Sequence, residues 1–144
     1  MRKVVTNNEA ETNRLGFELG EKLKPGEVVA LYGELGVGKT ALTKGMARGQ
    51  GIQDRLLSPT FVLVREYDLP SKEGKLYHLD LYRLESAKEL KSVNLEEMIN
   101  EGNNIVIIEW AEKAEKWLPK EAMKIKLASK GDTVREIVID KTKS

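Results

Sequence analysis

The chain has 144 residues, of which 40% are hydrophobic, so it is long enough for one domain with a substantial core and too short for two ordinary domains. Its 24 basic and 23 acidic residues give a formal net charge of +1, which argues against a free-standing nucleic-acid-binding protein. The absence of cysteine excludes disulfides and thiolate metal sites, and a single histidine argues against a histidine-based metal site.

The amino-terminal segment, residues 1–12, turns polar after two valines and contains no apolar signal-peptide core. No apolar run in the sequence approaches the roughly 20 residues that a membrane-spanning helix needs. We therefore expect a cytoplasmic protein without a membrane anchor.

The first part of the chain is predicted to form strand, helix and strand. Residues 3–6 have the composition of a short strand, and residues 8–11, Asn-Glu-Ala-Glu, resemble a capping box that opens a helix. Gly16 and Gly20 within this helix indicate close packing against another helix. Residues 27–32, EVVALY, form a continuous apolar run that is typical of a buried strand.

The rest of the chain alternates between predicted helices and strands. We expect one helix that ends near residue 51 and another at about residues 86–101. The expected strands lie at residues 61–67, 75–84, 104–110, 123–127 and 134–140, and the last two form a hairpin with one solvated face. The predicted fold class is α/β, with a central parallel sheet flanked by antiparallel strands, in a single domain that spans residues 1–144.

The segment 33–40, GELGVGKT, fits the phosphate-loop pattern G-x-x-x-x-G-K-[ST] between a predicted strand and a predicted helix. Glycines let backbone N–H groups turn inward around phosphate oxygens, and the helix adds the positive end of its dipole. Lys39 should reach the β- and γ-phosphates, and the Thr40 hydroxyl should bind Mg²⁺. The motif predicts the three-layer fold of phosphate-loop (P-loop) NTPases.

A nucleotide site of this class also needs a carboxylate that holds Mg²⁺ near the end of an apolar strand. Glu109 follows four aliphatic residues in IVIIEW and is a candidate for this role. The alternative interpretation is that Glu109 is a strand-end carboxylate that only faces water. Asp80, in LYHLDLYRL, is a second candidate. The alternative interpretation is that Asp80 is a structural ion-pair partner for Arg83 or Lys39. If this strand alternates regularly, Arg83 faces away from Asp80.

Two further polar side chains have open alternatives. Thr60 follows a proline in SPTF, where its hydroxyl could sense a γ-phosphate or cap a turn. His78 is the only histidine, which invites a catalytic role, but its position in a strand favours a hydrogen-bonded structural residue.

Missing motifs narrow the chemistry. The chain lacks Asn-Lys-x-Asp, and Asp80 does not begin Asp-x-x-Gly, so adenine is favoured over guanine. The arginines do not cluster into a lid of the kind that small-molecule kinases close over phosphates, so an ATPase is favoured. A small-molecule kinase and a nucleotide-binding module without hydrolysis remain the alternatives. Without clustered arginines, we expect a slow ATPase whose site another subunit completes.

The motifs GELGVGKT, SPTFVLVREY, HLDLYRL and VIIEWAEK occur in this order, and with them the chain resembles the TsaE (YjeE) family from NNEAET to about residue 119. These are small bacterial ATPases of tRNA threonylcarbamoyladenosine (t6A) modification. The resemblance implies a cytoplasmic enzyme that uses ATP and Mg²⁺, releases ADP, and acts with TsaD and TsaB. It implies contact with tRNA only indirectly, through that complex.

The motifs and the resemblance together give a predicted site. Its catalytic residues are Lys39, Thr60, Asp80 and Glu109, and its metal ligands are Thr40 and Glu109. The predicted nucleotide-binding residues are Asn8, Glu9, Thr12, Glu34, Leu35, Gly36, Val37, Gly38, Lys39, Thr40, Ala41, Trp110 and Lys130. The family often has Gly-x-Arg in its last hairpin, whereas this chain has KGDTVRE, in which Lys130 or Arg135 could make the same contact.

Overall fold

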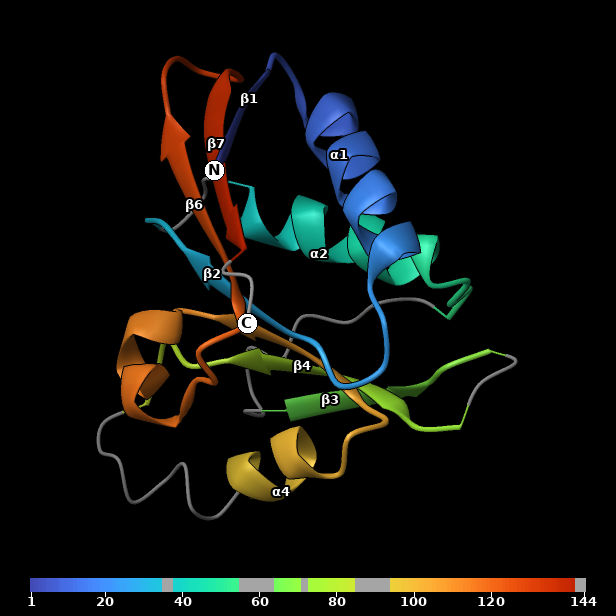
Figure 1. The fold of residues 1–144 in the computed structure, drawn as a ribbon. Coiled ribbons are helices and arrows are strands. Elements are labelled where there is room, and N and C mark those ends of the chain that lie inside the picture. Colours follow the sequence, from blue (N-terminus) through green and yellow to red (C-terminus); the bar gives the residue numbers. More distant parts are fainter. Residues whose placement is uncertain (35–37, 55–63, 71–72, 85–93, 142–144) are drawn as a thin grey trace.

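A mixed β-sheet runs through the centre of the molecule (Figure 1). We describe it in a computed structural model, for residues 1–34, 38–54, 64–70, 73–84 and 94–141. Within these ranges the sheet has seven strands in the order β1-β7-β6-β2-β5-β4-β3. The strands are β1 (Arg2–Thr6), β2 (Val28–Tyr32), β3 (Val64–Asp68), β4 (Lys75–Asp80), β5 (Ile105–Glu109), β6 (Met123–Ser129) and β7 (Arg135–Lys141).

The centre of the sheet is parallel and its margins are antiparallel. Strands β6, β2, β5 and β4 run parallel to one another. Strand β3 pairs antiparallel with β4, and β7 and β1 continue the other margin antiparallel to β6. This confirms the predicted mixed sheet, because the two continuous apolar runs, β2 and β5, occupy its covered centre.

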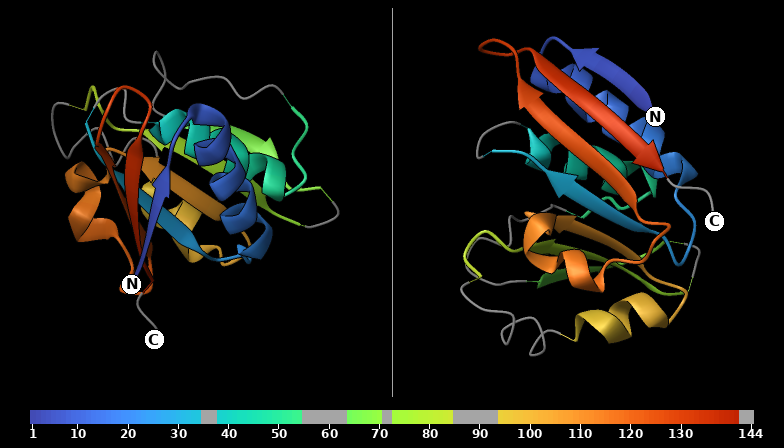
Figure 2. Two further views of the ribbon diagram at one scale, coloured as in Figure 1. Left: turned by 90° about the horizontal axis from the view of Figure 1, so that it is seen from above. Right: turned by 60° about the vertical axis from the view of Figure 1, so that its left-hand side comes forward.

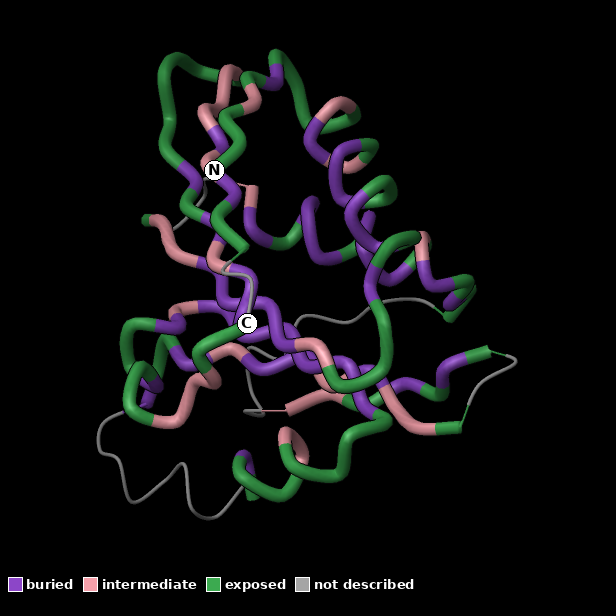
Figure 3. Tube along the Cα trace, viewed as in Figure 1, coloured by how far each residue is buried: buried purple, intermediate pink, exposed green. Residues whose placement is uncertain are grey.

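Helices cover both faces of the sheet (Figures 1 and 2). Helices α1 (Glu9–Lys22) and α2 (Lys39–Gly49) pack on one face, and the short helix α4 (Leu95–Asn100) and the 3₁₀ helix η1 (Ala111–Trp117) pack on the other. The buried segments gather along the central strands and on the inner sides of the helices (Figure 3). None of the described helices has the length and apolar character to cross a membrane.

Helix α1 begins as the capping box predicts, with one difference in the return contact. The Asn8 side chain accepts a hydrogen bond from the Glu11 N–H at 2.8 Å, which satisfies a free donor of the first turn. The Glu11 carboxylate accepts from the backbone N–H of Asn7 at 2.7 Å, one residue before the cap. The cap therefore fixes where the chain turns from β1 into α1.

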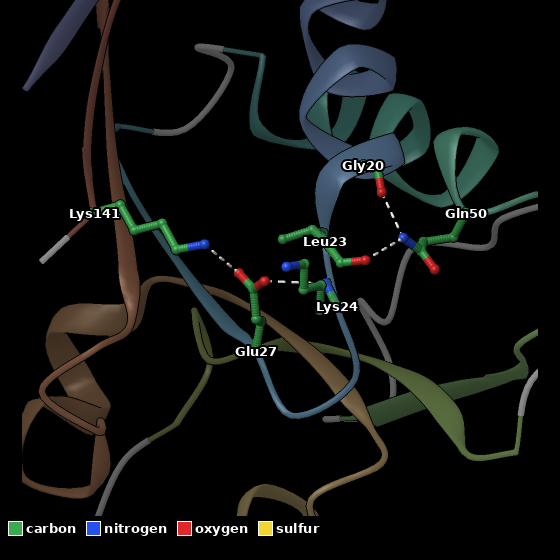
Figure 4. Close-up of polar contacts among 6 residues, drawn as sticks. All are labelled: Gly20, Leu23, Lys24, Glu27, Gln50 and Lys141. Atoms are coloured by element: carbon green, nitrogen blue, oxygen red, sulfur yellow. Dashed lines mark hydrogen bonds and ion pairs between the residues drawn. The ribbon is translucent and has the colours of Figure 1, made fainter. Parts of the chain in front are cut away.

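Helices α1 and α2 approach so closely that their backbones touch. A side chain at Gly16 would collide with the carbonyl oxygen of Leu42, and one at Gly20 with that of Met46. This confirms the close helix packing that the two glycines predict. At the far end of the pair, the Gln50 amide donates to the carbonyl oxygens of Gly20 at 2.5 Å and Leu23 at 2.9 Å (Figure 4).

The same end of the sheet is tied together by Glu27, the residue before β2. Its carboxylate accepts from the Lys24 N–H at 3.1 Å and from the Lys141 Nζ at 2.9 Å, as Figure 4 shows. These contacts join the start of β2 to the end of β7. The opposite end of the parallel strands holds the site described next.

One predicted strand is shorter in the structure, and one predicted helix is described only in part. The strand predicted at residues 75–84 ends at Asp80, and a turn follows in which the Leu84 N–H bonds the Leu81 carbonyl at 3.0 Å. The helix predicted at residues 86–101 is described from Leu95 onward, because residues 85–93 lie outside the described ranges.

Candidate functional site

A pocket of about 590 Å³ lies at the carboxyl ends of the parallel strands. Because β5 pairs with β2 on one side and β4 on the other, the residues that end these strands meet at one edge of the sheet. The lining residues come from five separate parts of the chain: Glu9, Thr12, Gly38, Lys39, Thr40, Ala41, Lys44, Asp80, Tyr82, Arg83, Glu109, Trp110, Asp132, Thr133 and Arg135.

The described ends of the phosphate loop have the backbone that the motif requires. Gly38 has φ 96°, a left-handed conformation that favours glycine, and α2 begins at the next residue, Lys39. The N–H groups of the first helical turn have no partner within the helix, and they lie where Lys39, Thr40 and Ala41 line the pocket. An anion in the pocket would meet these donors and the positive end of the helix dipole.

The Lys39 side chain is buried at the floor of the pocket. Its ammonium donates to the Gly33 carbonyl at 2.5 Å and lies 3.6 Å from the centroid of the Trp110 ring. Burial lowers the pKa of Lys39 from its ordinary value of 10.5, and the nearby Glu109 carboxylate is the largest influence in the opposite direction. Lys39 therefore places a buried, largely desolvated ammonium group beside the phosphate loop.

Trp110 follows β5 directly and turns the chain away from the sheet. It has φ 59°, which is uncommon for a residue other than glycine. Its ring packs against Tyr82, with 5.0 Å between the ring centroids. The aromatic pair forms the wall of the pocket next to Lys39.

The two strand-end carboxylates are neighbours in different surroundings. Asp80 is paired directly with Glu109 in the register of β4 and β5. Glu109 is buried, and its Oε2 lies 2.5 Å from the Nε2 of His78, so it does not face open water. Asp80 is half-buried as the last residue of β4 and accepts from the Tyr82 N–H at 3.0 Å.

These donors fit a magnesium ion bound together with phosphates. Thr40, Asp80 and Glu109 all line the pocket and offer the hard oxygen ligands that Mg²⁺ prefers. The described residues hold no cluster of three or more acidic or histidine side chains that would form an all-protein cage. One or two carboxylates completed by phosphate oxygens are the usual protein setting for Mg²⁺.

The pocket brings together a large part of the predicted site: Glu9, Thr12, Gly38, Lys39, Thr40, Ala41, Asp80, Glu109 and Trp110. Asn8 and Glu34 do not line it, and Asn8 caps α1. Lys130 does not line it either, and its Nζ lies 3.8 Å from the Glu136 carboxylate. The predicted residues Leu35, Gly36, Val37 and Thr60 lie outside the described ranges.

Other lining residues were not in the predicted site. Lys44 could have been found from the sequence, because it lies four residues after Thr40 and so on the same face of α2. Asp132 and Thr133 come from the turn between β6 and β7, and nothing in the strand pattern indicates that this turn reaches the pocket.

Two arginines also line the pocket. The expectation that Arg83 faces away from Asp80 required a regularly alternating strand. This condition is not met, because β4 ends at Asp80, and both residues line the pocket. Of the two hairpin residues that the sequence offered, Arg135 lines the pocket, and its guanidinium donates to the carbonyl oxygens of Gly131 at 3.1 Å and Asp132 at 3.3 Å.

The fold and the site define an α/β protein with a phosphate-loop motif at the carboxyl edge of parallel strands. The family described as threonylcarbamoyl adenosine biosynthesis protein TsaE matches residues 6–137. This chain therefore belongs to the TsaE family.

Curated relatives and a solved structure agree with this assignment. A Bacillus subtilis protein named tRNA threonylcarbamoyladenosine biosynthesis protein TsaE is 40% identical over 135 residues, which cover 92% of this chain and 80% of that protein. A Treponema pallidum protein of the same name is 37% identical over 139 residues, covering 95% and 98% of the two chains. The crystal structure of Bacillus subtilis YdiB matches with a TM-score of 0.82 at 33% identity, over 99% of this chain and 86% of that one.

Proposed function

We propose that this protein is a single-domain, cytoplasmic ATP hydrolase that binds ATP with Mg²⁺ and supports t6A modification of tRNA. The observation that carries the proposal is the meeting of Lys39, Thr40, Asp80 and Glu109 in one pocket at the amino end of α2. The names of the curated relatives support the place in tRNA modification. The family resemblance further supports TsaD-like and TsaB-like partners, with tRNA reached through them.

The residues around α2 would bind the nucleotide. The backbone donors of the first turn and the buried Lys39 ammonium favour the negative charge of a triphosphate. Glu9 and Thr12 line the pocket from α1, and Asp132 and Thr133 line it from the hairpin. These two pairs would flank the nucleoside end, since the phosphate end lies at Lys39.

The strand-end residues would serve the chemistry. Mg²⁺, when bound, neutralises charge on the phosphate oxygens. Thr40 and Glu109 would hold it, and the Asp80 carboxylate is close enough to Glu109 to orient a water molecule or accept its proton. Trp110 and Tyr82 would form an aromatic wall beside this part of the pocket.

The proposal is tested by titrating ATP calorimetrically into the protein with and without Mg²⁺. Lys39→Ala should remove most of the affinity, because it removes the phosphate cation, whereas Thr40→Ala should chiefly reduce the gain in affinity that Mg²⁺ brings. Lys22→Ala, at the far end of α1 and outside the pocket lining, is the control and should bind as the wild type does. Wild-type affinity in Lys39→Ala would disprove the assignment of the loop.

The small-molecule kinase alternative is separated by a second measurement. An ATPase releases inorganic phosphate from ATP and water alone, whereas a kinase needs an acceptor molecule. We expect steady phosphate release without any acceptor. Release that begins only when a small acceptor is added would favour the kinase.

A further inference from the structure

His78 is a buried side chain that the proposed function leaves unused. It lies in β4 two residues before Asp80, and its residue is only 1% exposed. In the register of the sheet it stands opposite Ile107 of β5, and its ring reaches past that residue to Glu109. The contact is between His78 Nε2 and Glu109 Oε2, 2.5 Å apart.

The hydrogen bonding of the ring is one-sided. His78 Nδ1 is buried and has no hydrogen-bond partner among the described residues. A neutral imidazole carries one N–H, and only a proton on Nε2 can be donated to the Glu109 carboxylate. Within the described part of the chain, the polar contact of this ring is therefore directed at Glu109 alone.

Glu109 depends on this contact because it is itself buried, at 4% exposure. A buried carboxylate without a donor is costly, and it would turn toward whatever donor or solvent it can reach. With Oε2 held by His78, the carboxylate is fixed in one orientation, and its other oxygen is left for the pocket that Glu109 lines. Partners of this kind orient metal-binding carboxylates and tune their affinity.

We propose that His78 is a positioning residue, which holds Glu109 by one oxygen so that the other oxygen faces the site. This inference rests on the proposed function, in which Glu109 holds Mg²⁺. A purely structural histidine would stabilise the fold and leave the response to Mg²⁺ unchanged. The two roles therefore differ in a measurable property other than stability.

The experiment compares His78→Gln with His78→Asn. Both variants carry an amide, but the glutamine nitrogen reaches about as far as Nε2, toward Glu109, whereas the asparagine nitrogen reaches only about as far as Nδ1. For each variant we would measure ATP affinity with and without Mg²⁺ by calorimetry, the kcat and KM of phosphate release, and unfolding in urea.

We expect His78→Asn to lose about tenfold or more of the Mg²⁺-dependent gain in ATP affinity and of kcat, while its affinity for ATP without Mg²⁺ stays at the wild-type level. His78→Gln should recover most of both losses. In a Glu109→Gln background, His78→Asn should add no further loss, because the two residues act as one unit.

Three results would overturn the proposal. The first is a wild-type Mg²⁺ response and kcat in folded His78→Asn, and the second is an equal loss in His78→Gln and His78→Asn. The third is a loss that adds in full to that of Glu109→Gln. Failure of the proposed function looks different: the ATP affinity of the wild type would then not respond to Mg²⁺, or Glu109→Gln would respond to Mg²⁺ as the wild type does, and the role of His78 would fall with it.

Discussion

Glu109 and Asp80 are paired at the ends of neighbouring strands, but their surroundings differ and suit them to different chemical roles. Glu109 is buried and held by His78, so its orientation is fixed by the protein. Asp80 is half-buried, lines the pocket and accepts a hydrogen bond from the Tyr82 N–H, so it can also contact water in the pocket. A fixed carboxylate suits a metal ligand, and a more accessible one suits contact with a water molecule.

The exchanges Glu109→Gln and Asp80→Asn should separate binding from turnover. Each keeps the shape of the side chain and removes its charge, so ATP should still bind while phosphate release falls at least roughly tenfold, or about 1.4 kcal/mol of activation free energy. The control is Glu112→Gln, which removes an exposed charge near Lys39 from outside the pocket lining. Normal hydrolysis in both variants, measured with the partners present, would show that these strand ends are not the active site.

A second residue-scale prediction concerns Tyr32, at the end of β2. Its hydroxyl donates to Glu115 of η1, and burial, followed by this hydrogen bond, raises its pKa above the ordinary value of 10.0. The neutral phenol is therefore favoured in the folded chain. Its stabilisation is fully present below pH 10.0 and is lost as the pH rises above that value, because the unfolded chain ionises first.

Urea unfolding of the wild type and Tyr32→Phe over a range of pH tests this. The difference in unfolding free energy between them should be constant from neutral pH up to about 10 and should then move against the wild type. In Glu115→Gln, the loss of stability above pH 10.0 should be smaller than in the wild type, because the burial of Tyr32 remains while the charge of Glu115 is gone. A difference that stays constant at high pH would contradict the raised pKa of Tyr32.

At the scale of elements, the sequence predicts the body of each strand better than its end. The apolar pattern of LYHLDLYRL continues to Leu84, yet β4 stops at Asp80. A tertiary contact holds the segment that follows: the Lys113 ammonium of η1 donates to the carbonyl oxygens of Tyr82 at 2.6 Å and Leu84 at 3.1 Å. No local pattern shows that a lysine about thirty residues later will hold this segment in a turn.

Lys113 therefore links η1 to the turn that carries Tyr82 and Arg83 into the pocket. Lys113→Met keeps the length of the side chain and removes both donors, so the turn should loosen and phosphate release should fall by roughly threefold to tenfold, or about 0.7–1.4 kcal/mol of activation free energy. Lys116→Met, an exposed exchange on the same helix, is the matched control. Equal rates of phosphate release in the two variants would show that the turn does not need the hydrogen bonds of Lys113.

At the scale of the whole molecule, the pocket is assembled from segments between Glu9 and Arg135. The part made by α2, β4 and β5 could be predicted, because a glycine loop and strand-end carboxylates have sequence patterns tied to their chemistry. The contributions of α1 and the hairpin were suggested only by the family resemblance. Their placement depends on the packing of α1 on α2 and on the order of β6 and β7 in the sheet, which local patterns do not contain.

The arrangement also changes the reason to expect dependence on partners. Scattered arginines suggested that another subunit supplies the missing cation, but Arg83 and Arg135 both line this pocket. The pocket is instead open to water, since Thr40, Tyr82 and Arg83 are exposed. Charges in an open pocket are screened, and a partner that covers it would exclude water and strengthen their effect on the transferring phosphate.

The last prediction follows from this exposure. The isolated protein should release phosphate slowly, and the rate should rise at least roughly tenfold, or about 1.4 kcal/mol, when TsaD-like and TsaB-like proteins are both added. Either partner alone should have a smaller effect. The measurement is phosphate release for the protein alone and for each combination at one salt concentration, with Arg83→Ala as a companion variant. Because we expect Arg83 to act in the covered site, Arg83→Ala should lower the rate of phosphate release by the full complex while the partners still bind. Fast release by the isolated protein, unchanged by partners, would show that the exposed pocket is already complete.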